Sequence, residues 1–192
     1  MNILEETVKA VDELRHALKV LYTMQEELTA AATALRVAVI QETPILIFGN
    51  GGSAADAMHM AAELVARFKI NRKAIRAMAL STDPAITSAI GNDFGFDMGF
   101  VRQIEAYGSP RGVAIGISTS GRSENVTKGL IRARTLGMKC IALTGCAGLG
   151  IDIEDLIDIR VPSSNTPRIQ EVHTLLIHVL CDYVERTVFG GE

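Results

Sequence analysis

Two short segments carry the residue types that bind a phosphate group. The first, GNGGS at residues 49–53, follows the apolar run ILIF and precedes a helical pattern. Its glycines leave room for a ligand and permit positive φ, so backbone N–H groups and the positive end of the next helix can converge on an anion. We expect Ser53 or Asp56 to cap that helix. The loop is equally compatible with a plain tight connection between a strand and a helix.

The second segment is STSGRSEN at residues 118–125, which also leaves an apolar strand pattern and enters a helix. It places four hydroxyl groups within six positions, more than helix capping requires. This surplus favours a phosphorylated, hydroxyl-rich ligand. A dinucleotide is disfavoured because GCAGLG at residues 145–150 lacks the GxGxxG spacing. The hydroxyl groups belong to Ser118, Thr119, Ser120 and Ser123.

Titratable side chains recur on the helix predicted after the first loop. His59, Glu63 and Arg67 are spaced four residues apart, so they form one polar stripe on that helix. One interpretation is a solvent-facing stripe with a Glu63–Arg67 ion pair. The other is the wall of a ligand pocket that begins at the phosphate loop. The spacing alone leaves both open.

The C-terminal segment, predicted as a long helix from about Pro167, has polar residues in its apolar middle. Gln170 and His178 are eight positions apart, roughly 80° of helix rotation, which lets both face one cleft. We interpret His173 as a hydrogen-bonded core residue. His178 lies among leucine, isoleucine and valine, where a polar group needs a specific reason.

A further polar pair, Asn92 and Asp93, belongs to GNDFGFD at residues 91–97, which is predicted as a loop after a short helix. Asn, Asp and Gly all favour turns. The same side chains can also hydrogen-bond to sugar hydroxyl groups. The sequence does not decide between these two roles.

Strand-like and helix-like segments alternate around these loops. Alternation of this kind predicts an α/β fold with a parallel sheet covered by helices on both faces, and continuously apolar strands fit such burial. Ligands of such sheets bind beyond the carboxyl ends of the strands, where the winding direction switches. The strand-like segments are ILIF from residue 45, AIRAMAL from 74, GVAIGIS from 112, KCIAL from 139 and LIDIRV from 156.

Two amphipathic helices are expected before the first strand. Apolar residues recur at steps of three and four from Leu4 to Leu21, and a second helical stretch spans about Glu26 to Gln41. We interpret this region as partly an oligomer interface, with packing on its own domain as the alternative.

Composition restricts the class of protein. The chain has 192 residues, 48% hydrophobic and 21% charged, with a formal net charge of −3. We therefore expect one domain over residues 1–192 and no nucleic-acid partner. The N-terminus lacks the layout of an export signal and no apolar run approaches the ~20 residues of a membrane helix, so a cytoplasmic protein without membrane association is expected. Three cysteines without a CxxC pair argue against disulfides and a cysteine-rich zinc site.

Four ordered motifs resemble those of the phosphoheptose isomerases, within the sugar-isomerase (SIS) domain group. They are GNGGSAADAMHMAAEL, GNDFGF, GISTSGRSENV and RIQEVHTLLIH, and the resemblance covers about residues 40–185. It implies a flavodoxin-like, three-layer α/β/α sandwich with a five-stranded parallel sheet. It also implies a homotetramer, with a helical oligomerisation segment at residues 1–41 and a sugar-phosphate-binding core at residues 42–192.

The resemblance implies an activity and its residues. The family converts sedoheptulose 7-phosphate to D-glycero-D-manno-heptose 7-phosphate through an enediol, the first step of ADP- or GDP-heptose biosynthesis for lipopolysaccharide. Glu63 and His178 would be the acid–base pair. One zinc ion per subunit would be bound by His59, Glu63, Gln170 and His178. Substrate contacts would come from Asn50, Gly51, Gly52, Ser53, Glu63, Asn92, Asp93, Ser118, Thr119, Ser120, Ser123 and Gln170.

The residue types suit this reaction. One group must take the C1 proton and another must protonate the neighbouring oxygen or carbon, and Glu63 and His178 supply a base and an acid. A carboxylate fully committed to a metal ion cannot also act as a free base, so the two roles of Glu63 are in tension. The alternative function is a non-catalytic SIS adaptor resembling the replication-initiation regulators, which act by binding protein. The combination of His59, Glu63, Gln170 and His178 favours the enzyme.

Overall fold

The computed structural model describes residues 2–190, and a sheet of five parallel strands forms its centre. The spatial order of the strands is β2-β1-β3-β4-β5. The five-stranded parallel sheet is therefore confirmed, while residues 1, 191 and 192 of the predicted domain lie outside the described range. The strands are β1 (Ile45–Gly49), β2 (Ala77–Ala79), β3 (Val113–Ser118), β4 (Lys139–Thr144) and β5 (Ile157–Arg160).

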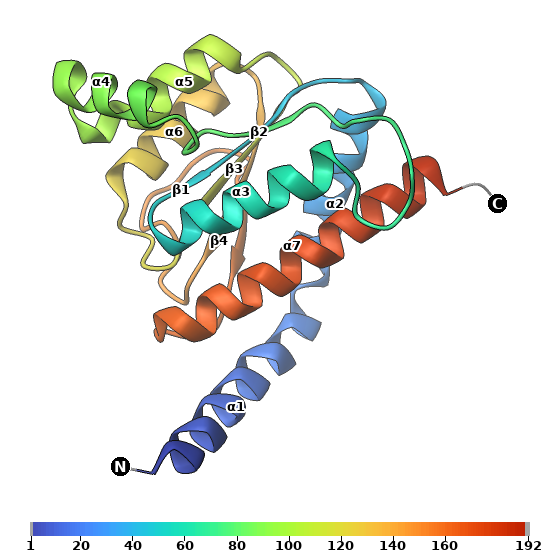
Figure 1. Cartoon of the computed structure of the whole chain (residues 1–192), viewed down its shortest axis with the longest axis vertical. Helices are drawn as coiled ribbons and strands as arrows, with labels where there is room; N and C mark the ends of the chain where they lie inside the picture. Colours follow the sequence, from blue (N-terminus) through green and yellow to red (C-terminus); the bar gives the residue numbers. More distant parts are fainter. Residues whose placement is uncertain (1, 191–192) are drawn as a thin grey trace.

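Helices cover both faces of the sheet (Figure 1). Helices α2, α3 and α7 pack on one face, and α5 and α6 pack on the other. Strand residues alternate between the two cores, since Ile45 and Ile47 face the first layer whereas Leu46 and Phe48 face the second. The helices are α1 (Ile3–Val20), α2 (Gln25–Ile40), α3 (Gly52–Val65), α4 (Pro84–Phe94), α5 (Gly99–Tyr107), α6 (Glu124–Thr135) and α7 (Thr166–Phe189), with 3-10 turns η1 (Leu21–Thr23) and η2 (Phe96–Met98).

Strands β1 and β3 lie side by side, but the helices that follow them cover opposite faces. Gly49 at the end of β1 pairs with Ile117 near the end of β3, so both following loops start at the same edge of the sheet. α3 follows β1 onto one face, and α6 follows β3 onto the other. The winding direction reverses here, which is where ligands of such sheets bind.

The two N-terminal helices pack differently. α2 is buried against its own sheet, and its Leu35 and Ala38 are fully covered. α1 packs on α7 through its second half, around Ala17, and its first half projects from the body (Figure 1). The exposed half carries an apolar stripe, which we call the α1 stripe. Its residues are Ile3, Leu4, Val8 and Val11.

The capping prediction for α3 is wrong. The N-cap is Gly51, with φ of +55° and no side-chain cap, so neither Ser53 nor Asp56 fills that role. A left-handed φ favours glycine, which explains the residue type at position 51. Asp56 lies inside the helix and accepts a hydrogen bond from Thr174 Oγ1 at 2.9 Å.

Two further local predictions also need correction. α3 ends at Val65, so Arg67 lies beyond the helix and the polar stripe ends at Glu63. Among residues 2–190 the carboxylate of Glu63 is paired with His59 rather than with Arg67. Asn92 and Asp93 lie in the last helical turn of α4, not in a loop, because the chain leaves the helix only at Gly95 with φ of +93°.

Two expectations about the chain's chemistry can be compared with the described residues. Cys140, Cys146 and Cys181 are free thiols. Within residues 2–190, no helix has both the length and the apolar character needed to cross a membrane.

His173 is a core residue, as predicted. Its Nε2 lies 3.2 Å from the carbonyl oxygen of Thr144, and because a carbonyl only accepts, Nε2 carries the proton. Nδ1 is buried without a partner among the described residues. Burial lowers the pKa of His173 from 6.5 to about 4, which outweighs the opposite effect of the Thr144 hydrogen bond.

This lowered pKa predicts a loss of stability in mild acid. Between pH 6.5 and about 4, His173 binds a proton in the unfolded state but not in the folded state. The free energy of unfolding therefore falls as the pH drops through that window. At full extent the loss is about 3 kcal/mol. Denaturant unfolding at pH 7.0 and pH 4.5 should show a smaller loss for His173→Gln than for the unsubstituted chain. The exposed His16→Gln serves as control, and equal losses in all three proteins would contradict the prediction.

Candidate functional site

The two predicted phosphate loops meet at the carboxyl edge of the sheet and are joined by a pair of amides. Asn50 Nδ2 donates to Asn125 Oδ1, and Asn125 Nδ2 donates to Asn50 Oδ1, each at 2.9 Å. Asn125 is buried in the first turn of α6. Asn125 is not among the site residues predicted from the sequence, because its partner lies 75 positions away.

The hydroxyl groups of the second loop differ in exposure. Ser118 is buried and donates a hydrogen bond to Ser123 Oγ at 3.0 Å, whereas Ser120 is exposed and accepts from the N–H of Arg122 at 3.2 Å. Gly121 has φ of +67°, and a Cβ there would collide with the carbonyl of Gly148. Glycine at position 121 therefore lets the second loop pass close to the loop that follows β4.

A cavity of about 220 Å³ opens beside the first loop. Gly49, Asn50 and Gly51 line one side, while Thr87 of α4 and Gln103 of α5 contribute to the other. The edge of the sheet at which a ligand is predicted to bind therefore contains a cavity.

Asn92 and Asp93 lie outside the lining of this cavity. Both are exposed at the end of α4, where Asn92 Nδ2 donates to Asp93 Oδ1 at 2.7 Å. Within one chain, the structure does not bring this pair to the two loops.

Three side chains from α3 and α7 converge further along these helices. His59 Nε2 lies 3.2 Å from both Glu63 Oε1 and His178 Nε2. One ligand atom from each residue falls within a group whose members are all within 4.8 Å of one another. We call His59, Glu63 and His178 the metal cluster.

Hydrogen bonds alone do not account for the arrangement of the metal cluster. A neutral imidazole nitrogen either donates one hydrogen or accepts through one lone pair, yet His59 Nε2 faces two polar atoms. Tetrahedral ligands 2.0–2.1 Å from a zinc ion are about 3.3 Å apart, close to the separations found here. Two imidazoles and a carboxylate also form a known catalytic zinc set with one open position. The three side chains therefore fit a metal ion.

Gln170 lies at the other end of the α3–α7 contact. A Cβ on Gly52 would collide with its amide, so this side chain lies against the first turn of α3. Gln170 precedes His178 by eight residues, about 12 Å along the helix axis. Both residues face α3, as the predicted shared cleft requires. Within one chain, however, Gln170 lies against the first predicted phosphate loop and not beside the metal cluster.

Two more residues of the α3–α7 region were not predicted from the sequence to belong to the site. Asp56 is buried between the helices, and burial raises its pKa against the opposing effects of Thr174 and His59. The ring of Phe68 packs 5.6 Å from the ring of His178. The Asp56–Thr174 and Phe68–His178 contacts each join residues more than 100 positions apart in the sequence, so no local pattern reveals them.

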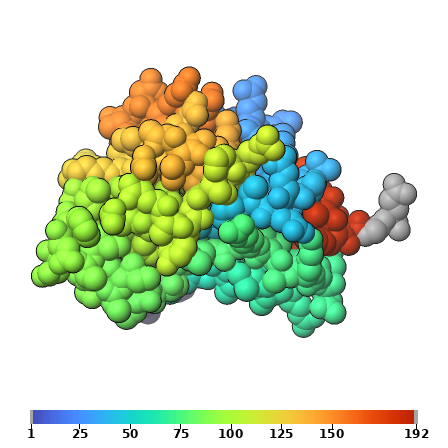
Figure 2. All heavy atoms as spheres, turned by 90° about the horizontal axis from the view of Figure 1, so that it is seen from above, coloured from blue at the N-terminus to red at the C-terminus, as the bar shows by residue number. Residues whose placement is uncertain are grey.

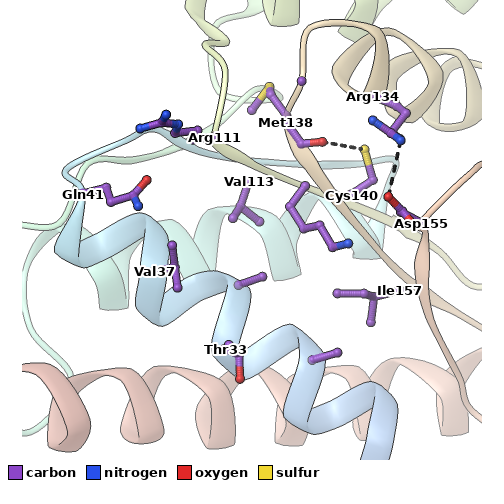
Figure 3. Close-up of a pocket in the computed structure, with 14 residues that line it drawn as sticks. Thr33, Val37, Gln41, Arg111, Val113, Arg134, Met138, Cys140, Asp155 and Ile157 are labelled. Carbon is purple, nitrogen blue, oxygen red and sulfur yellow. Dashed lines mark hydrogen bonds and ion pairs between the residues drawn. The ribbon is translucent and has the colours of Figure 1, made fainter.

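A larger cavity, of about 600 Å³, lies at the opposite edge of the sheet (Figure 3). Thr33 and Val37 of α2 line one wall, and Val113 and Ile157 at the starts of β3 and β5 line another. None of the predicted site residues lines this cavity, so it is separate from the site.

Comparisons with known proteins identify relatives with matching sequence over most of their length. The family model described as SIS domain matches residues 10–145. A phosphoheptose isomerase of Geobacter sulfurreducens is 48% identical over 182 residues, which cover 92% of this chain and 96% of the relative. A phosphoheptose isomerase of Helicobacter pylori is 48% identical over 168 residues, which cover 88% of each chain.

Two solved structures share the fold. The phosphoheptose isomerase GmhA of Neisseria gonorrhoeae superposes with a TM-score of 0.88 at 37% identity, covering 96% of this chain and 99% of that one. A phosphoheptose isomerase of Francisella tularensis gives a TM-score of 0.91 at 34% identity, covering 97% and 100%. The α/β SIS architecture implied by the four motifs is therefore confirmed.

The amide pair between the two loops generates a stability prediction. Asn125→Ala removes three hydrogen bonds, two with the amide of Asn50 and one from the backbone N–H of Val126, and leaves the amide of Asn50 without its partner. This should lower the free energy of unfolding by about 1 to 3 kcal/mol. Asn92→Ala is the matched control, because its amide contacts only an exposed neighbour, and it should cost less than about 0.5 kcal/mol. Denaturant titration measures both, and equal losses would contradict the prediction.

Proposed function

The chain belongs to the phosphoheptose isomerases of the SIS-domain family, and from this premise we propose that it converts sedoheptulose 7-phosphate to D-glycero-D-manno-heptose 7-phosphate. This activity is that of an aldose–ketose isomerase at the start of heptose biosynthesis. The observation that carries the proposal is the metal cluster, in which His178 of α7 meets His59 and Glu63 of α3, the helix that begins at the first predicted phosphate loop. The adaptor alternative finds no support in these relatives, which bear the name of an enzyme.

The phosphate end of the substrate is assigned to the two loops. The N-terminus of α3 carries a partial positive charge, and the hydroxyl groups of the second loop supply further donors. Gln170, beside the first turn of α3, is suited to the same end of the substrate. The sugar contacts assigned to Asn92 and Asp93 remain a prediction. The proposed contacts in the two loops are Asn50, Gly51, Gly52, Ser53, Ser118, Thr119, Ser120 and Ser123.

The reacting end is assigned to the metal cluster. His59 follows Gly52 by seven residues, about 10 Å along α3. The phosphate of the substrate and its C1 and C2 atoms lie at opposite ends of a seven-carbon chain. An extended ligand with its phosphate at the loop therefore suits proton transfer further along the helix.

Glu63 and His178 have the atoms for the proton transfers. Glu63 is the proposed base that takes the C1 proton, and His178 is the proposed acid at the neighbouring oxygen. Oε1 of Glu63 and Nε2 of His178 belong to the metal cluster, so Oε2 and Nδ1 lie outside it. If a metal ion were held through Oε1 of Glu63 and Nε2 of His178, Oε2 and Nδ1 would be the atoms available to take and donate the proton, and each residue could fill both roles.

We propose that the metal is zinc, held by His59, Glu63 and His178. When bound, zinc would act as a Lewis acid that polarises the substrate carbonyl. Gln170 as a fourth ligand would have to come from a second copy of the chain, because its own copy of the amide lies at the phosphate loop.

A homotetramer is the proposed assembly. The α1 stripe is uncovered in a single chain. Further apolar side chains are exposed around the metal cluster on the outer faces of α3 and α7. They are Met58, Val65, Leu175 and Val179.

The acid–base assignment predicts a loss of turnover. Glu63→Gln and His178→Ala should each lower kcat by about 10² to 10⁴-fold, because each removes a proton-transfer group. The Michaelis constant should change much less, since the phosphate loops are intact. The measurement is NMR detection of the aldose formed from sedoheptulose 7-phosphate with zinc supplied.

The control for this experiment is Glu154→Gln, the same chemical change at an exposed carboxylate far along the chain. It should retain full turnover. Near-normal turnover in both Glu63→Gln and His178→Ala would contradict the roles assigned here. Absence of any aldose from the unsubstituted chain would contradict the proposed function and favour the adaptor.

The assembly has its own test. Val8→Asp places a charge in the α1 stripe and should shift the mass measured by light scattering from that of a tetramer toward smaller species. Lys9→Gln makes the same change in net charge at an exposed position on the opposite face of the helix, and it should leave the mass unchanged. A monomeric mass for the unsubstituted chain would reject the tetramer.

A further inference from the structure

The segment after α3, residues 66–76, contains no helix or strand but is tied to α7. The backbone N–H groups of Phe68, Lys69 and Ile70 donate to the carboxylate of Glu185 at 2.7, 2.6 and 2.9 Å. Glu185 lies on α7, seven residues after His178. The ribbon and the space-filling view both show this segment running beside the C-terminal end of α7 (Figures 1 and 2).

Arg72 of this segment reaches the end of α3. Its Nη2 donates to the carbonyl of Glu63 at 2.9 Å, and its Nη1 donates to the carbonyl of Leu64 at 2.7 Å. Carbonyls in the last turn of a helix lack intrahelical partners and carry partial negative charge, so a guanidinium is a suitable cap.

Arg72 and Glu185 form one buried ion pair. Nε of Arg72 lies 3.0 Å from Oε1 of Glu185, with side chains 2% and 1% exposed. Burial raises the pKa of Glu185, but the three backbone N–H groups and Arg72 lower it, and the net direction is downward. The carboxylate is therefore ionised at neutral pH. Breaking such a pair is costly, although a buried pair is weak evidence for net stabilisation.

The pair is linked to both helices that carry the metal cluster. Arg72 binds the backbone of Glu63, and Glu185 binds the backbone of Phe68, whose ring packs on His178. We propose that the Arg72–Glu185 pair is a positioning device that holds Glu63 and His178 at metal-binding separation. This inference rests on the proposed metal site and adds two positioning residues to it.

The expected effect is on metal affinity. Outer-shell partners of metal ligands typically change affinity by 10- to 100-fold when they are replaced. Glu185→Gln removes the charge, and one amide oxygen cannot accept all three N–H groups, so the segment should shift. We expect zinc affinity to fall by about tenfold or more.

The experiment uses the full chain and zinc in competition with a chromophoric chelator. The visible absorption of Co²⁺ in the same site reports coordination geometry independently of activity. Glu171→Gln is the matched control, because Glu171 lies on the same helix seven residues before His178 and pairs with Arg168 near the surface. This control should bind zinc within about twofold of the unsubstituted chain.

A second variant keeps the proposal testable if Glu185→Gln does not fold. Phe68→Leu keeps the ion pair and the backbone hydrogen bonds but removes the aromatic contact with His178. It should remain folded by circular dichroism, bind zinc more weakly and alter the Co²⁺ spectrum. If Glu185→Gln does not fold, Phe68→Leu tests the contact through which the pair reaches His178, and undiminished zinc binding by this variant overturns the proposal.

The outcomes separate the inference from the proposed function. Zinc binding by the unsubstituted chain that is lost in His59→Ala supports the metal site itself. If folded Glu185→Gln and Phe68→Leu then bind zinc as tightly as Glu171→Gln, the positioning role is overturned and the metal site stands. No stoichiometric zinc binding by the unsubstituted chain overturns both.

Discussion

The side-by-side packing of α3 and α7 is the constraint on which the proposed chemistry depends. His59 and His178 are 119 positions apart in the chain, and their Nε2 atoms approach to 3.2 Å only because the two helices lie together on one face of the sheet. The contact is held at both ends. Gln170 lies against Gly52 at one end, and the Arg72–Glu185 pair joins the helices at the other.

The sheet determines where the helix pair begins relative to the predicted ligand-binding loops. Because β1 and β3 are parallel neighbours, the loops that follow them lie at one edge of the sheet, and the reversal of winding there sends α3 and α6 onto opposite faces. The proposed anion site is thereby at the start of α3, and the proposed proton-transfer groups begin two turns further on. Groups carried by packed helices keep their spacing better than groups on loops, which suits a site that must hold both ends of one extended ligand.

Sequence reasoning located the five strands and both loops, because buried parallel strands are continuously apolar and their loops carry glycine and hydroxyl groups. It failed where local pattern and tertiary structure diverge. The polar stripe ends at Glu63 because α3 ends at Val65, where Arg72 from a later segment binds the last carbonyls of the helix. The Asn50–Asn125 and Phe68–His178 contacts join distant segments, so no spacing rule reveals them.

The central claim is that His59, Glu63 and His178 share one metal ion. Anomalous diffraction at the zinc absorption edge, from crystals of the zinc-loaded protein, tests it most directly. The account predicts one strong peak about 2.0 to 2.2 Å from Nε2 of both histidines and from a carboxylate oxygen of Glu63. A zinc peak elsewhere with this cluster vacant, or no peak at all, would contradict it.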